Sequence, residues 1–460
     1  MHTYILRRIL LMFPTLLGIT LIVFIVMASA PGGISAQKLI EGQELDAEQK
    51  QALEKYYNKL YGLNDPAPVQ YLRWLNNVSP IGFTFDDENK LNGFSFSKGS
   101  NFGTSFLYGR PVLDVVVERV PITLLLNIIS LPLIYIIAIS FGVRAAVMRG
   151  KSFDIVSSIT MLGLWSVPTM LAGVLFIGFF ASDQYWHWFP TAGLSDLEAL
   201  DMPFLPHWSS LPDILFMFLF MLGSTFTFIW LSMWNNNKLR VIAMTLVGFA
   251  LGLLMALNVA TDIHFLFSFI NVIVITIIFF IIAKSEFIAL RVVTFGIVGL
   301  FIGLGIAMNT ASGEFVRGFA LDRLWHLVLP VICLSYGSFA ALSKLMRTAV
   351  LENLLADFAR TARAKGVSEE KVLWRHVFRN SLLPLITISA SLLPTLLAGS
   401  VIVEAIFSID GMGKLAVEAV KGRDREMVLS VTLVSGILTL VGYLIADICY
   451  AIVDPRVSYD

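Results

Sequence analysis

Long runs of apolar residues without a single charge dominate the chain and alternate with polar stretches. A helix needs roughly 20 apolar residues to cross the hydrocarbon core of a membrane, where its backbone polar groups must be satisfied internally. We therefore predict an all-α, polytopic membrane protein. Ten segments meet the length requirement: 9–30, 120–143, 155–182, 214–234, 241–260, 263–283, 292–310, 324–343, 381–403 and 427–446.

Composition supports this prediction, because 57% of the residues are hydrophobic and only 14% are charged. A soluble domain has about half apolar and about a quarter charged residues. The 33 basic and 33 acidic residues cancel, which argues against a nucleic-acid partner and leaves only local charge to interpret. Cys333 and Cys449 both lie in apolar runs, and the sequence has no disulfide framework and no metal-ligand spacing.

Lysine and arginine in short loops predict the orientation, since these residues resist translocation. The first apolar run exceeds the roughly 7–15 residues of a signal-peptide core, so it is interpreted as an uncleaved anchor. Both termini are then cytoplasmic, and residues 31–119 form an extracytoplasmic region. Within it, residues 39–63 are predicted to be helical, and Asn92-Gly93 signals a β-hairpin turn.

The longest cytoplasmic segment carries the most specific pattern, LENLLADFARTARAKGVSEEKVLWRHVFRNSLLP, from Leu351 to Pro384. We predict two short helices that meet at Gly366, with Ser368 capping the second helix. One apolar face is predicted for the first helix, from residues at helical spacing: Leu351, Leu354, Leu355, Phe358 and Ala362. The basic residues opposite can pair with a partner protein or rest on anionic lipid headgroups.

FARTARAKG followed by VLWRHVFRNSLLP resembles the cytoplasmic coupling loop of ABC transporter permeases of the oligopeptide, dipeptide and nickel importer family. Further similar strings are YILRRILLMFPTLLGITLIVFIVMASAPGG, LYGLNDPAPVQYLRWL, GRPVLDVVVERVPITLLL, LWHLVLP, VEAIF, GRDREM and ADICYAIVDPR. Three departures stand out. Asp410-Gly411 replaces an external Pro-Gly pair, Arg360-Thr361-Ala362 takes the place of the general Glu-Ala-Ala signature, and Phe378-Arg379 replaces the later Leu-Pro.

The resemblance covers residues 1 to about 193 and about 320 to 460, and it implies a six-span type I importer core with a four-span insertion. The predicted organisation is a first transmembrane helix (1–30), an extracytoplasmic region (31–119), core helices two and three (120–193), an inserted segment with four transmembrane helices (194–319), and the remaining core helices with the coupling loop 351–380 (320–460). The inserted helices, at 211–310, are interpreted as lipid-facing or as a docking surface for an additional partner.

The resemblance also implies a function: a permease subunit that forms half of the path for peptides or similar small solutes. The implied partners are a second similar permease, two ATP-binding-cassette ATPase subunits, an extracytoplasmic solute-binding protein and the lipid bilayer of the bacterial inner membrane. The predicted contact or geometry residues of the coupling loop are Arg360, Ala362, Arg363, Gly366 and Arg375. Nickel and sugars remain alternative cargoes within the family.

No energy source is visible in the chain itself. Gly150-Lys151-Ser152 lacks the glycine that a phosphate-binding loop needs five positions earlier, where Ala145 stands. We therefore expect no enzyme activity and no cofactor in this chain, with ATP bound by partner subunits. The alternative is an ion-driven secondary transporter, which places ionisable groups within the membrane. Glu404 and Asp447 are the candidates for such groups.

Overall fold

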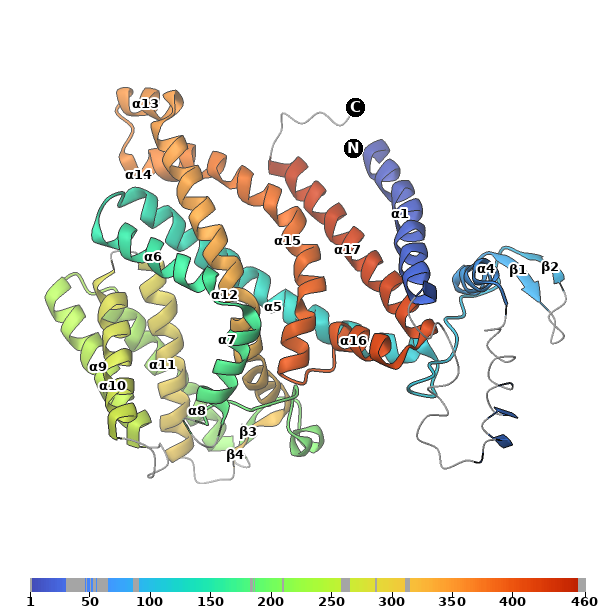
Figure 1. The fold of residues 1–460 in the computed structure, drawn as a ribbon. Helices are drawn as coiled ribbons and strands as arrows, with labels where there is room; N and C mark the ends of the chain where they lie inside the picture. Colours follow the sequence, from blue (N-terminus) through green and yellow to red (C-terminus); the bar gives the residue numbers. More distant parts are fainter. Residues whose placement is uncertain are drawn as a thin grey trace. The chain divides into compact units, whose positions relative to one another are not determined.

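The computed structural model describes residues 2–29, 46, 48–49, 51–52, 55, 65–85, 91–182, 185, 187–208, 211–257, 265–285, 288–310 and 315–453. Figure 1 shows a chain built almost entirely of helices. The chain divides into two compact units. The first unit comprises Met1–Tyr135 and Lys344–Asp460, and the second comprises Ile136–Ser343.

Within the described residues, seven helices are long and apolar enough to cross a membrane. They belong to α1 (His2–Ser29), α5 (Val112–Val147), α8 (Leu211–Ser232), α9 (Asn237–Leu257), α11 (Ile288–Thr310), α12 (Gly318–Leu355) and α17 (Arg425–Val453). A sharply bent helix pair adds an eighth span if the pair is counted as one. Helices α10 (Phe265–Lys284) and α15 (Phe378–Ile406) lie over the two remaining apolar runs. The predicted all-α polytopic class is confirmed.

The apolar run 155–182, predicted as one span, is broken into two helices. It forms α6 (Ser152–Ser166) and α7 (Thr169–Phe176), which meet at 94° and continue into a π-helical turn, Ile177–Ala181. Pro168 explains the break, because a proline disfavours the helical conformation of the preceding residue. Val167 accordingly has an extended backbone, with ψ 122°.

The first unit holds helix α4 (Ala67–Val78), from the predicted extracytoplasmic region, against α1. Tyr71 and Trp74 of α4 are almost fully buried and pack with Phe24 of α1. The Tyr71 hydroxyl donates a hydrogen bond to the Leu17 carbonyl oxygen at 3.1 Å and lies 2.9 Å from the Thr20 hydroxyl. These aromatic residues of the VQYLRWL string therefore anchor α4 to α1.

An antiparallel hairpin follows α4, formed by β1 (Gly82–Phe85) and β2 (Leu91–Ser95). The hairpin itself is as predicted, but its turn is not at Asn92-Gly93. These residues lie inside β2, where Gly93 pairs with Thr84 beside an irregularity in the register. The backbone at this position has φ +149°, which residues with a side chain rarely adopt. Glycine can adopt it because it has no Cβ. The helix predicted over 39–63 falls almost entirely outside the described residues.

In the second unit, α8, α9, α10 and α11 lie side by side (Figure 1), with α8 against α11 and α9 against α10. Glycines spaced four residues apart allow the close approach. A Cβ at Gly303 of α11 would lie 2.4 Å from the Phe220 carbonyl oxygen of α8, and one at Gly252 of α9 would lie 3.0 Å from the Val272 Cα of α10. Small residues at helix contacts are typical of membrane proteins, where apolar surface alone does not drive association.

We expect Gly303→Ala to destabilise the α8–α11 pair, because the new methyl group would meet backbone atoms that cannot turn aside. Overpacking of this kind costs about 1–3 kcal/mol. Gly305→Ala on the same helix is the matched control, since a Cβ there meets nothing within 4 Å. Thermal unfolding in detergent should show a lower midpoint for Gly303→Ala alone. Equal midpoints for the two variants would contradict this packing.

Candidate functional site

The predicted coupling segment forms two helical pieces joined by a tight turn. Helix α12 ends at Leu355, α13 spans Asp357–Ala364, and α14 (Glu369–Lys371) runs through a π-helical stretch, Val372–Val377, into α15. Between α12 and α13 only Ala356 leaves the helical conformation, with φ −69° and ψ 153°. The segment is therefore a compact bend that is continuous at both ends with long membrane helices.

Gly366 makes the turn between α13 and α14. Its φ is +77°, in the left-handed region that favours glycine. The Val367 amide donates to the Ala362 carbonyl at 3.2 Å, and the Gly366 amide donates to the Arg363 carbonyl at 2.9 Å. This is the Schellman arrangement for ending a helix. Ser368 then occupies the predicted N-cap position of α14, although its side chain makes no capping hydrogen bond.

Arg363 braces this bend from inside. Its Nε donates to the Glu369 carboxylate at 2.8 Å, and its Nη1 donates to the Leu354 carbonyl at 3.0 Å. The guanidinium of Arg363, a residue of α13, thus links the last turn of α12 to the first turn of α14. In this structure Arg363 has a geometric role within the segment.

A second brace joins the helices on either side of the segment. The Asn353 amide of α12 donates to the Ser381 hydroxyl of α15 at 3.1 Å and to the Ala349 carbonyl at 2.9 Å. The buried Ser381 hydroxyl lies 2.8 Å from the Val377 carbonyl. The Asn353–Ser381 hydrogen bond joins the end of α12 to the beginning of α15, so the two helices that flank the bend are held together.

The other predicted coupling residues differ in exposure. Arg360 is exposed and lies 3.5 Å from its neighbour Asp357, whereas Ala362 is buried. Arg375 is exposed on the π-helical stretch. Arg360 and Arg375 are thus available to a partner, while Ala362, Arg363 and Gly366 shape the bend.

The apolar face predicted for the first helix is wrong, because the break at Ala356 places its residues on two helices. The buried face of α13 consists instead of Ala359 and Ala362. Leu355 and Phe358 are exposed, as is Trp374 beyond the turn. The exposure of these apolar side chains was not predicted, although an aromatic residue within a polar segment is the signal that marks them.

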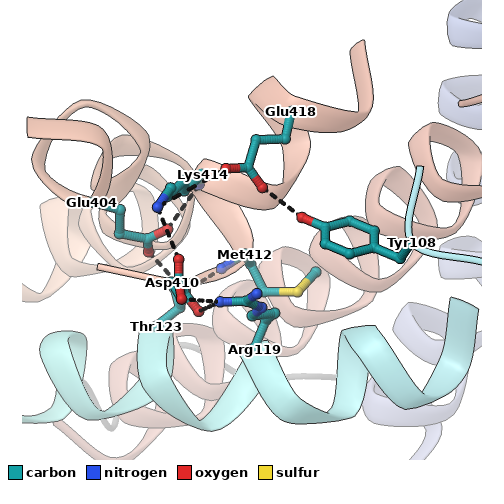
Figure 2. Close-up of polar contacts among 8 residues, drawn as sticks. All are labelled: Tyr108, Arg119, Thr123, Glu404, Asp410, Met412, Lys414 and Glu418. Carbon is teal, nitrogen blue, oxygen red and sulfur yellow. Dashed lines mark hydrogen bonds and ion pairs between the residues drawn. The ribbon is translucent and has the colours of Figure 1, made fainter. Parts of the chain in front are cut away.

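On the predicted extracytoplasmic side of the first unit, Glu404 anchors the turn that follows α15. Its carboxylate is fully buried and accepts hydrogen bonds from the Thr123 hydroxyl at 2.8 Å and the Lys414 amide at 3.0 Å (Figure 2). The Thr123 hydroxyl also accepts the Met412 amide at 2.8 Å. A Cβ at Gly411 would lie 2.4 Å from this carboxyl group, so a side chain there would displace Glu404 from its hydrogen bonds.

Charged side chains surround that turn. The carboxylate of Asp410 pairs with Arg119 and with Lys414, at 2.9 Å in each case (Figure 2). The Tyr108 hydroxyl donates to Glu418 at 2.6 Å. Burial, together with the hydrogen bond to Glu418 and the charge of that residue, raises the pKa of Tyr108 to about 12. Tyr108 is therefore a neutral donor at any physiological pH. Asp410-Gly411 forms a well-paired turn in place of the Pro-Gly pair of the resembling family.

The GRDREM string forms a second corner, between α16 (Met412–Gly422) and α17. The fully buried carboxylate of Asp424 accepts the Ser105 hydroxyl at 2.6 Å, the Leu107 amide at 3.1 Å and the Met427 amide at 3.1 Å. Arg425 donates to Gln70 at 2.9 Å. The corner ties the segment before α5 and helix α4 to the last membrane helix, α17.

The two ionisable residues considered for ion coupling both have structural partners. Glu404 holds the turn described above. Asp447 of α17 pairs with Arg8 of α1 at 3.1 Å. Their positions are thus explained by folding, and neither supports the alternative of an ion-driven transporter.

Together, the many apolar helices and the bent segment between α12 and α15 fit a polytopic transport permease. The chain matches the binding-protein-dependent transport system inner membrane component over residues 248–459, and the N-terminal part of such membrane components over residues 1–127. It is 30% identical to the oligopeptide transport system permease protein AppB of Bacillus subtilis, over the full length of both. It is 26% identical to the peptidoglycan transport system permease protein YejB of Agrobacterium fabrum, over 100% of this chain and 99% of that protein.

The chain belongs to the binding-protein-dependent transport system inner membrane component family and is a permease subunit of an ABC importer. It is a multi-pass inner-membrane protein whose family works with ATPase and substrate-binding components. The alignments with AppB and with the inner membrane ABC transporter permease protein YejB of Escherichia coli O157:H7, at 24% identity, cover the entire chain. The predicted inserted segment, 194–319, therefore lies within the length that is aligned with these relatives.

Proposed function

We propose that this permease forms half of a translocation path for short peptides, paired with a second, similar permease. In this proposal two ATPase subunits bind ATP, an extracytoplasmic binding protein delivers the cargo, and both termini of the chain are cytoplasmic. The peptide cargo rests on the full-length similarity to permeases named for oligopeptide and peptidoglycan transport. The coupling segment is the contact with an ATPase.

The observation that carries the coupling role is a rigid bend with an exposed outer surface. Arg363 and the Asn353–Ser381 brace fix the bend internally. Its outer surface presents the exposed Phe358 and Trp374 beside basic side chains. Aromatic and arginine side chains dominate the binding energy of protein interfaces, and such a surface fits an apolar groove rimmed by acidic groups.

Copurification tests this role. We expect Arg360→Glu to weaken capture of the ATPase subunits by at least about tenfold, because a cation facing acidic groups becomes an anion. Arg149→Glu is the control, since Arg149 is an exposed arginine in a different predicted cytoplasmic loop. ATPase capture that is unchanged by Arg360→Glu, and also by deletion of residues 357–376, would refute the assignment.

A further inference from the structure

A cluster of four polar side chains lies around the beginning of α12, within the second unit. Arg317 pairs with Asp196 at 2.6 Å and with Asp322 at 3.2 Å. The Asp196 amide donates to the Asp322 carboxylate at 3.0 Å. His326 lies one helical turn after Asp322, and the side chains of both are 1% exposed. The cluster thus joins the 3₁₀ turn Leu197–Asp201, which follows Asp196, to the first turns of α12.

The hydrogen bonding of His326 defines which of its nitrogens is free. Nδ1 lies 2.9 Å from the Asp322 carbonyl oxygen, which can only accept, so Nδ1 carries the hydrogen. In the neutral ring, Nε2 is then an acceptor whose lone pair points away from α12. This atom is buried and makes no hydrogen bond within the described part of the chain.

Nε2 faces another acceptor. It lies 3.5 Å from Oδ1 of Asp196. A protonated imidazole bound to a carboxylate would have a nitrogen–oxygen distance of about 2.7–2.9 Å. Two acceptors at this separation fit the ligand shell of a cation between them: bonds of about 2.0–2.1 Å at the tetrahedral angle place two ligands of zinc about 3.3–3.4 Å apart.

We propose that Asp196, Asp322 and His326 bind a divalent transition-metal cation of the Zn²⁺ type. One ligand atom from each residue lies within 4.8 Å of the others. An imidazole ligand favours zinc and its neighbours over Mg²⁺ or Ca²⁺, which prefer oxygen ligands alone.

Arg317 is a positioning residue in this site. Its guanidinium forms ion pairs with Oδ2 of Asp196 and Oδ1 of Asp322. The other oxygen of Asp196, Oδ1, lies near His326 Nε2. With a neutral imidazole, two carboxylates and one guanidinium give the cluster a net charge of −1, which still attracts a cation. Hydrogen-bonded carboxylates of this kind are usual around metal ligands. The bound cation would crosslink the 3₁₀ turn to α12 and stabilise the folded state by mass action.

The test uses the full-length protein in lipid nanodiscs, purified with a histidine-free affinity tag, and titrates Zn²⁺ by calorimetry. We expect one tight equivalent per chain and zinc–ligand distances of about 2.0–2.1 Å by X-ray absorption. Asp196→Asn and His326→Gln should each weaken this equivalent by at least about 100-fold. His376→Gln, in the cytoplasmic segment, is the matched control and should bind zinc like the unmodified protein.

Asp196→Asn is expected to fold normally, because the Asp196 side chain is 49% exposed and asparagine has nearly the same size. A loss of zinc binding in this variant therefore cannot be attributed to misfolding. Absence of a tight zinc equivalent in the unmodified protein would overturn the proposal, and so would an equivalent that survives both ligand substitutions. The measurement needs no ATPase or cargo, so its outcome is independent of the proposed transport function.

Discussion

Arg363→Met is expected to uncouple ATP hydrolysis from transport while leaving the membrane helices folded. The substitution removes the hydrogen bonds from the guanidinium to the Leu354 carbonyl and to Glu369. A hydrogen bond to a charged group contributes about 1.5–3 kcal/mol, and the exposed Glu369 pair contributes less. Loss of roughly 1.4 kcal/mol lowers the equilibrium constant for the ordered bend tenfold. We therefore expect cargo-stimulated ATPase activity to fall, by up to about tenfold, in proteoliposomes with the partner subunits.

Hydrogen exchange provides the structural measurement for this variant. The amides of α13 should exchange faster in Arg363→Met, whereas those of α17 should not change. Lys365→Met removes an exposed cation two positions away and should leave both exchange and activity as they are. If Arg363→Met keeps the slow exchange of α13, the bend does not depend on this guanidinium.

Asp424→Ala is expected to give the largest loss of stability. The Ser105 hydroxyl and the Leu107 amide would lose their buried acceptor, at about 1–3 kcal/mol each, and α17 would lose an N-cap that contributes about 1 kcal/mol. A total of roughly 3–7 kcal/mol is a large share of the usual 5–15 kcal/mol of folding stability. The thermal midpoint in detergent should therefore fall by several degrees.

Asp410→Ala is the control for the same region. Its carboxylate also pairs with two side chains, but it is 54% exposed. Pairs in contact with water contribute about 0–1 kcal/mol, so the midpoint should move little. Similar shifts for the two variants would show that burial of Asp424 is not what stabilises the corner.

The membrane helices could be predicted because the constraint on them is local. Any charge-free run of about 20 residues must satisfy its own backbone in lipid, whatever surrounds it. The turn at Gly366 could be predicted for a similar reason, since the left-handed conformation is a property of a single residue. The resemblance of the coupling segment and of the terminal strings then correctly indicated the family.

Other features depend on residues far apart in the chain and could not be predicted. Alanine is the strongest helix former, so nothing in the sequence marks Ala356 as a break between α12 and α13. The internal role of Arg363 requires the fold that brings the Leu354 carbonyl to it. Likewise, Asp424 finds its partners more than 300 positions earlier in the chain, at Ser105 and Leu107.

In the proposed coupling role, the joint at Ala356 determines which motions can pass from an ATPase to α12. Consecutive Cα atoms stay 3.8 Å apart, so a one-residue joint cannot stretch, and a push or pull on α13 reaches α12 without loss of travel. Torque is different, because the two backbone torsions of Ala356 can absorb a rotation. The Arg363 guanidinium spans the joint to the Leu354 carbonyl and resists that swivel. The covalent chain and the backbone hydrogen bonds on either side of Ala356 thus connect α12 to α13, and the Arg363 guanidinium adds a side-chain bond that resists rotation between them.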